Sequence, residues 1–174
     1  MAIEGIRQPE ILPVDEELRL RKYDGICDFA LEWYQDVEMI RLVDGVPEPY
    51  DMAQLLRMYR YLDAHGELYF IERKEKDRFE PIGDVTFWKD DMPIVIGRAD
   101  LRQKKIGTRV VKALIRRGKE LGYKTLKVGE IYDENEGSRK LFTGLGFRAY
   151  EKTVKGWRYE LCLDTGTETE ETNR

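Results

Sequence analysis

The sequence predicts a mixed α/β fold in which one sheet is covered by helices on both faces. Segments with apolar residues at every second position alternate along the chain with segments of helical spacing, and this alternation predicts the class. With 174 residues, of which 41% are hydrophobic, the chain is long enough for one domain with a real core and short for two. We therefore expect one domain over residues 1–163 and a polar, acidic, disordered tail over 164–174.

The front of the chain reads as a strand followed by two helices. Apolar and charged residues alternate over 17–24, which is typical of a strand. Helical spacing marks 25–37 and 51–66, and turn formers separate the two segments. The apolar face expected for the first of these helices consists of Ile26, Phe29, Ala30, Trp33, Tyr34 and Val37.

The rest of the chain reads as three strands, a helix, a strand, a helix and two strands. β-prone apolar runs predict the strands, and the amphipathic pattern after Arg102 predicts the longest helix. The expected strands are 67–74, 80–88, 92–100, 125–132, 147–154 and 156–163, and the expected helices are 102–122 and 136–144.

Composition excludes several classes of protein. The net charge of −4 argues against a general nucleic-acid binder, although the stretch around Arg102 is locally basic. Cys27 and Cys162 lie far apart and belong to no disulfide framework or zinc motif, so we expect a reduced, cytoplasmic protein without a metal. The single histidine, His65, precedes a glycine and is expected to end a helix. No signal peptide or membrane span is legible, so no membrane partner is expected.

A basic, glycine-containing turn opens the helix predicted at 102–122. It reads Arg102-Gln103-Lys104-Lys105-Ile106-Gly107 and follows a strand. The first turn of a helix presents unpaired N–H groups and the positive end of the helix dipole, so this turn is expected to bind an anion. An ordinary solvated basic face is the alternative.

A second motif surrounds the helix predicted at 136–144. Asn135 stands before this helix, Ser138 follows three residues later, and Leu141-Phe142 and Gly146-Phe147 close it. The simpler alternative is that Asn135 only caps the helix and that Leu141 and Phe147 are core residues. With the basic turn and the order of elements over about 16–163, this motif resembles the GCN5-related N-acetyltransferase (GNAT) family, which transfers acetyl from acetyl-coenzyme A to an amine.

The resemblance implies the GNAT acyl-CoA N-acyltransferase fold, a mostly antiparallel sheet that splays between its fourth and fifth strands. It also implies acetyl-CoA as cosubstrate, with its pyrophosphate at the basic turn and its pantetheine arm along the backbone of 94–98. Gly97 suits a bulge or a close backbone approach, although 94–96 also fits a plain buried strand. The implied coenzyme-binding residues are Ile94, Val95, Ile96, Gly97, Arg98, Arg102, Gln103, Lys104, Lys105, Ile106, Gly107, Thr108, Asn135, Ser138, Arg139 and Phe142.

Two positions depart from the family pattern. Lys105 stands where the first glycine of the turn is usual, and it lacks the freedom of glycine at positive φ. Phe142 stands where many relatives carry the tyrosine thought to protonate the coenzyme thiolate, and a phenyl ring donates no proton. Tyr132 or water is the expected substitute.

The reaction requires that an ammonium acceptor lose a proton before its nitrogen attacks the thioester. Glu130 is the leading base, because some relatives that modify protein N-termini carry their proposed base at this place. Strand alternation places Val128, Glu130 and Tyr132 on one face, so Glu130 and Tyr132 are the expected catalytic residues. The alternative for Glu130 is a strand residue paired with a surface cation.

For the acceptor site we expect Trp33, Tyr34, Glu67 and Asp84, because aromatic rings and carboxylates suit a cationic amine. Core packing is the alternative for both aromatic residues, and a turn or strand edge is the alternative for Asp84. The segment 28–45 also resembles the openings of relatives that modify antibiotics or ribosomal-protein N-termini.

The resulting hypothesis is an N-acetyltransferase that acts on a primary amine, either of a small cationic molecule or of a protein N-terminus. A catalytically silent coenzyme-A-binding module and nucleic-acid binding by Lys105, Arg109, Lys112 and Arg116 are the competing classes. A homodimer is left open.

Overall fold

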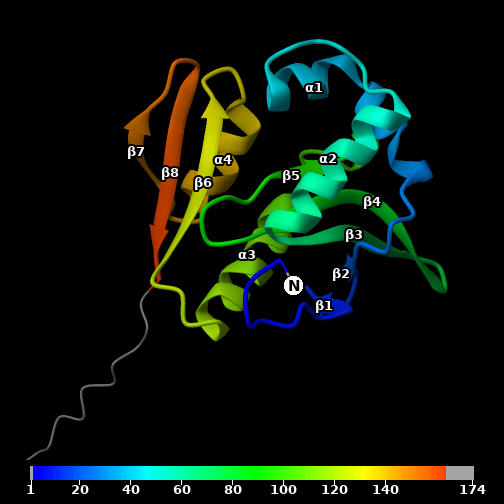
Figure 1. Cartoon of the computed structure of the whole chain (residues 1–174), viewed down its shortest axis with the longest axis horizontal. Coiled ribbons are helices and arrows are strands. Elements are labelled where there is room, and N and C mark those ends of the chain that lie inside the picture. The colour runs from blue at the N-terminus through cyan, green and yellow to red at the C-terminus, as the bar shows by residue number, and fades with distance from the viewer. Residues whose placement is uncertain (1, 164–174) are drawn as a thin grey trace, which may run out of the picture.

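The computed structural model describes residues 2–163, which form two antiparallel sheets. The five-stranded sheet has the order β1-β2-β3-β4-β5, and the three-stranded sheet has the order β6-β8-β7. Figure 1 shows the smaller sheet and α4 standing beside the larger sheet with its helices. The strands are β1 (Ile11–Pro13), β2 (Leu18–Lys22), β3 (Glu67–Glu75), β4 (Arg78–Phe87), β5 (Ile94–Ile96), β6 (Thr125–Tyr132), β7 (Arg148–Lys152) and β8 (Gly156–Cys162).

The α-helices are α1 (Val37–Asp44), α2 (Met52–His65), α3 (Ile106–Glu120) and α4 (Glu136–Gly144). Three short 3₁₀ turns, η1 (Asp28–Ala30), η2 (Trp33–Gln35) and η3 (Ala99–Leu101), join them to the strands. No helix within residues 2–163 is long and apolar enough to cross a membrane. The tail expected over 164–174 lies outside the described residues.

Helices cover both faces of the five-stranded sheet, as the sequence predicts. One hydrophobic cluster joins the sheet to α3, α4 and the smaller sheet, with Leu20, Val85, Val110 and Phe142 among its members. A second cluster joins the opposite face to α1 and α2, with Ile40, Tyr59 and Phe70 among its members. Because successive strand residues point to opposite faces, β3 contributes Tyr69 and Ile71 to the first cluster and Leu68 and Phe70 to the second.

The helix predicted over 25–37 is wrong. The segment instead forms η1 and η2 and then an extended residue, Asp36, whose side chain accepts a hydrogen bond from the N–H of Met39 and begins α1. Ile26 and Val37, expected on the buried face, are 61% and 41% exposed. Tyr34 has non-helical backbone angles (φ −88°, ψ 15°) and Asp36 is extended, so the segment does not continue as one helix.

The strand β1 was not expected, because the N-terminal segment lacks clear alternation. Ile11–Pro13 pairs with β2 at the edge of the sheet. Pro13 fits there because an edge strand leaves N–H positions that need no ladder partner.

The two sheets separate between β5 and β6, as the resemblance to the GNAT family implies. At the vertex the N–H of Lys127 donates to the carbonyl of Lys89 at 2.9 Å. Two residues further, the N–H of Gly129 donates to the Asp91 carboxylate at 2.8 Å, and the N–H of Met92 donates to the same oxygen. A side chain therefore takes the place of a strand partner where β6 leaves the larger sheet.

Gly129 allows a close approach at this vertex, because a Cβ there would lie 3.0 Å from the Asp91 carboxylate. The register of β6 against β8 shifts between Val128 and Ile131, so the strand bulges at Gly129 and Glu130. The expectation that Val128 shares a face with Glu130 is therefore wrong, since Val128 and Ile131 are buried while Glu130 is exposed.

Replacing Asp91 with Ala is expected to lower the free energy of unfolding by about 1–3 kcal/mol, because two partly buried N–H groups lose their acceptor. Urea denaturation measures the change. Asp90→Ala is the matched control, since Asp90 is exposed and adjacent. Equal stability of the two variants would contradict this role of Asp91.

Candidate active site

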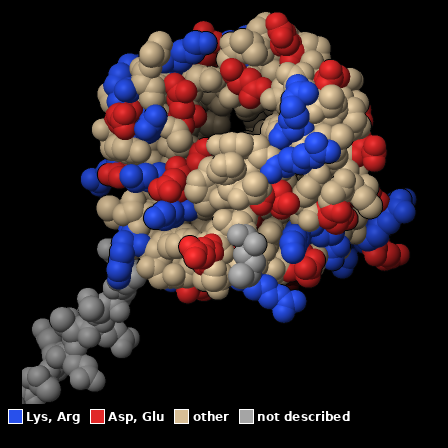
Figure 2. All heavy atoms as spheres, in the orientation of Figure 1, with Lys and Arg blue, Asp and Glu red and all other residues tan. Residues whose placement is uncertain are grey.

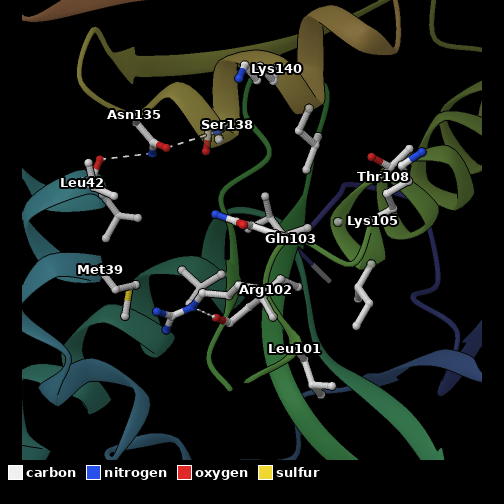
Figure 3. Close-up of a pocket in the computed structure, with 18 of the residues that line it drawn as sticks. Met39, Leu42, Leu101, Arg102, Gln103, Lys105, Thr108, Asn135, Ser138 and Lys140 are labelled. Atoms are coloured by element: carbon white, nitrogen blue, oxygen red, sulfur yellow. Dashed lines mark hydrogen bonds between the residues drawn. The ribbon is translucent and has the colours of Figure 1, made fainter. Parts of the chain in front are cut away.

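A cavity of about 650 Å³ lies where the two sheets diverge. A hollow is visible at this place in Figure 2, and Figure 3 shows α1 on one side of the cavity and the start of α3 on the other. This volume suits a small-molecule or cofactor site. The lining residues are Glu38, Met39, Leu42, Val43, Ile94, Val95, Ile96, Leu101, Arg102, Gln103, Lys105, Ile106, Gly107, Thr108, Asn135, Gly137, Ser138, Lys140 and Leu141.

Helix α1 crosses from the larger sheet to the β6–α4 connection and closes one side of the cavity. The Asn135 amide donates to the carbonyl of Leu42 at 3.3 Å, and the Tyr132 hydroxyl lies 3.4 Å from the carbonyl of Asp44. Arg41 pairs with Glu134 on the same crossing. These contacts join the two sheets across the gap that their strands leave open.

The start of α3 presents backbone N–H groups to the cavity. The first helical bond runs from the N–H of Arg109 to the carbonyl of Lys105, so the N–H groups of Ile106, Gly107 and Thr108 precede the helical pattern. No side chain among the described residues caps this end. The dipole of a fifteen-residue helix adds partial positive charge there.

The turn before α3 holds two non-glycine residues at positive φ. Gln103 has φ 60° and Lys105 has φ 61°, so Lys105 adopts the left-handed conformation that a glycine would take more readily. This conformation costs roughly 1–2 kcal/mol for a residue with a Cβ. It turns the backbone so that the chain enters α3 directly beside the cavity.

Two glycines allow close approaches around the cavity. A Cβ on Gly97 would lie 2.1 Å from the Trp33 ring, so the indole packs directly on the backbone after β5. A Cβ on Gly107 would lie 2.5 Å from a methyl group of Leu141, so α4 packs against the first turn of α3. The close approach expected at Gly97 is therefore present.

The free edge of β5 faces the cavity. The N–H of Thr86 donates to the carbonyl of Pro93, and the N–H of Gly97 donates to the carbonyl of Ile82. In an antiparallel ladder this register directs both polar groups of Val95 toward β4 and the N–H groups of Ile94 and Ile96 away from it. The outer edge thus offers hydrogen-bonding groups to an extended ligand.

Asn135 performs two tasks at the opposite wall. Its side-chain oxygen accepts a hydrogen bond from the N–H of Ser138 at 3.1 Å and so caps α4, while its amide reaches Leu42. Figure 3 shows both bonds. The capping role considered from the sequence is present, and the residue also lines the cavity.

A family model for the acetyltransferase (GNAT) domain matches residues 17–148, which is most of the chain. The chain belongs to the GNAT acetyltransferase family. The activity of this family is acetyl transfer from acetyl-CoA to an amine, and the antiparallel sheets with their splay are its fold. No curated protein sequence matches the chain.

Solved structures resemble this GNAT fold at low sequence identity. A domain from Methanocaldococcus jannaschii aligns with a TM-score of 0.74 and 23% identity, over 86% of this chain and 100% of that one. The acetyltransferase of Salmonella typhimurium that modifies the N-terminal serine of ribosomal protein L7/L12 aligns with a TM-score of 0.67 and 14% identity, over 89% of this chain and 100% of that one. The aminoglycoside acetyltransferase AAC(6')-Ib in complex with coenzyme A aligns with a TM-score of 0.67 and 14% identity, over 83% of this chain and 94% of that one.

Most of the expected coenzyme-binding residues of this GNAT domain line the cavity. Gly97, Arg98, Lys104, Arg139 and Phe142 are the exceptions. Arg98 pairs with Glu75 and Asp100. Phe142 is 2% exposed and packs edge-on against Phe147 within the core. The ring of Phe142 is thus a core side chain.

The carboxylate and phenol expected to catalyse lie beside the cavity rather than in its lining. Glu130 is exposed and accepts a hydrogen bond from the Thr153 hydroxyl at 2.5 Å. Tyr132 lies close enough to feel the charge of Glu130, and its hydroxyl faces the end of α1. Burial, together with the charges of Glu130 and Asp44, raises the pKa of Tyr132. Tyr132 is therefore a neutral phenol at neutral pH.

The expected acceptor residues fall into two groups. Tyr34 and Tyr59 both donate to the buried carboxylate of Asp84, at 2.9 Å and 2.8 Å, behind the β5 wall of the cavity. Trp33 packs against Gly97 next to them. None of these side chains lines the cavity. The alternative that Trp33 and Tyr34 pack in the core therefore fits the structure.

Glu67 lies on the other face of the sheet. Arg117 of α3 pairs with it at 2.6 Å, and the Tyr69 hydroxyl donates to it at 2.8 Å. Its carboxylate is 2% exposed. The structure therefore assigns it a buried ion pair between sheet and helix, away from the cavity, and corrects the expectation that it binds substrate.

Sequence reasoning missed the wall that α1 supplies, because a wrong helix was expected just before it. Glu38 is the one carboxylate among the lining residues, and Met39, Leu42 and Val43 are apolar. An aspartate followed by an amphipathic run was the available signal for this helix. Leu101, Gly137, Lys140 and Leu141 were also not assigned to the site, although they lie within or beside its two motifs.

Replacing Asp84 with Asn is expected to change how stability depends on pH. Burial raises the pKa of Asp84 from 3.8 to about 6, so the folded protein holds this proton more tightly than the unfolded chain does. As the pH rises from 3.8 to about 6, the free energy of unfolding of the wild type should therefore fall by about 1–3 kcal/mol relative to that of Asp84→Asn. Urea denaturation at several pH values in this range measures the free energy of unfolding of both proteins. A difference between them that does not change with pH would contradict the prediction.

Proposed function

We propose that the cavity binds acetyl-CoA and that the protein transfers its acetyl group to a primary amine. The observation that carries the proposal is that three separate features face one cavity of about 650 Å³: the uncapped start of α3, the free edge of β5 and Asn135. The start of α3 suits the diphosphate, and the edge of β5 suits the two amides of the pantetheine arm. Lys105 and Lys140 add positive charge at the cavity.

The acceptor is proposed to be a small cationic amine. Glu38 lies in the cavity lining, and Asp44 and Glu130 lie around the crossing of α1 and β6, where carboxylates favour an approaching cation. Arg41 pairs with Glu38 and with Glu134 at this crossing. A protein N-terminus is the alternative acceptor. Similar structures include both an aminoglycoside acetyltransferase and an enzyme that modifies a ribosomal-protein N-terminus, so both classes are worth testing.

In the proposed reaction the neutral amine attacks the thioester carbonyl and the carbon–sulfur bond breaks. The nitrogen loses one proton and the coenzyme sulfur gains one, so the products are an amide and free coenzyme A. Glu130 is proposed to accept the proton from the amine, directly or through water, and Tyr132 is proposed to supply the proton to sulfur. Phe142 is excluded from the second task, because its ring is apolar and buried in the core.

The first experiment measures free-thiol release from acetyl-CoA by the purified protein. The acceptors are aminoglycosides, polyamines, amino acids and short peptides with free N-termini, and coenzyme binding is measured separately by calorimetry. Stimulation by one acceptor class identifies the acceptor. Coenzyme binding without thiol release from any of them would instead favour a silent coenzyme-binding module.

Reversing the charge at the start of α3 is expected to weaken coenzyme A binding at least tenfold. In Lys105→Glu a carboxylate would stand beside the proposed diphosphate site. Lys112→Glu is the matched control, because it makes the same charge change on an exposed position of the same helix. Calorimetry gives both dissociation constants, and equal weakening by the two variants would argue against this diphosphate site.

Replacing Tyr132 with Phe is expected to lower kcat by about 10²-fold and to leave KM nearly unchanged, because the hydroxyl acts on the leaving sulfur rather than on binding. Steady-state kinetics with the acceptor found above measures both constants. Tyr150→Phe, on the exposed strand β7, is the control. An unchanged kcat would remove Tyr132 from the mechanism.

A further inference from the structure

The side chain of Arg102 is turned away from the start of α3. Its Nε donates to the carbonyl of Ile96 at 2.9 Å, and one terminal nitrogen donates to the carbonyl of Gly97 at 3.1 Å. The other terminal nitrogen pairs with Asp36 at 2.7 Å. All three nitrogens of the guanidinium therefore bind groups of the protein itself.

Asp36 uses its second oxygen in a different contact. That oxygen accepts a hydrogen bond from the N–H of Met39 at 3.2 Å and caps α1. The hydrogen bond from Arg102 is the main cause of a lowered pKa of Asp36, so the carboxylate is charged at neutral pH. The guanidinium thus connects Asp36, the residue before α1, to the carbonyl of the last residue of β5 and to the carbonyl of Gly97 that follows it.

These two elements form two walls of the cavity. Helix α1 contributes Met39, Leu42 and Val43, and β5 contributes the edge described above. In Figure 3, Arg102 extends toward Met39, while Lys105, just before α3, and Thr108, in its first turn, lie on the other side. The spacing of the walls therefore depends on where the guanidinium holds Asp36.

We propose that Arg102 is a positioning residue that fixes α1 against the end of β5, and that it is not a ligand of the coenzyme phosphates. This inference rests on the proposed function in so far as the cavity binds coenzyme A. Lys105 remains available for the phosphates, because it forms no ion pair with another residue of 2–163.

The two roles of Arg102 predict opposite effects for a change at Asp36. If Arg102 bound phosphate, Asp36→Asn would free the guanidinium and remove a competing negative charge, and coenzyme A would bind more tightly. If Arg102 positions α1, the same change loosens the wall and coenzyme A binds more weakly. Asparagine caps a helix as well as aspartate does, so the change leaves the start of α1 capped.

The experiment compares Asp36→Asn, Arg102→Gln and the double variant. The matched control is Asp15→Asn, because Asp15 also accepts backbone N–H bonds and pairs with an arginine, Arg109, at 2.7 Å, away from the cavity. Calorimetry measures coenzyme A binding, and hydrogen exchange of the coenzyme-free proteins measures the opening of 37–44.

We expect Asp36→Asn and Arg102→Gln each to weaken coenzyme A binding about three- to tenfold. The double variant should bind coenzyme A no more weakly than the single variant that binds it less well. Asp15→Asn should bind coenzyme A as the wild type does. Exchange in 37–44 should be at least threefold faster in both single variants. Tighter or unchanged binding by Asp36→Asn, or unchanged exchange in Arg102→Gln, would overturn the proposal. A wild type that binds no coenzyme A would refute the proposed function, and the exchange measurement would still decide the role of Arg102.

Discussion

The hydrogen bond from the N–H of Gly129 to the Asp91 carboxylate is the constraint on which the site depends. A strand beside a sheet edge ordinarily continues to pair, since each unpaired N–H favours another backbone partner. Here a side chain satisfies that N–H, and β6 bulges and leaves the larger sheet. The free edge of β5, the gap beside it and the cavity all follow from this departure.

A second connection crosses the gap, in addition to the hydrophobic cluster that the two sheets share with α3 and α4. The segment from Trp33 to Asp44 supplies it. Trp33 packs on Gly97, Tyr34 reaches Asp84, and Asp36 pairs with Arg102 before α1 continues to the β6–α4 connection. Side chains close together in the sequence thus have partners on different elements, and the segment connects these elements before α1 begins.

Local patterns predicted the parts of the site that local interactions build. The basic turn, the start of α3 and the cap at Asn135 are each formed by a few consecutive residues, and the sequence placed them correctly. The wall from α1 depends on long-range contacts and was missed. Glu67 and Asp84 illustrate the same limit, because both are buried strand carboxylates, yet one faces Arg117 of α3 and the other faces Tyr34 and Tyr59. Their partners, rather than their residue type, decide which face each one serves.

The packing of Trp33 on Gly97 gives the protein an internal optical probe. This indole is 6% exposed and touches the backbone just beyond β5, whereas Trp88 and Trp157 lie partly exposed at other places. The emission of a tryptophan depends on its surroundings, so a ligand that moves the β5 wall would change the fluorescence of Trp33 without any label. A ligand that moves this wall would therefore be detected in the unmodified protein, even where it gives no reaction.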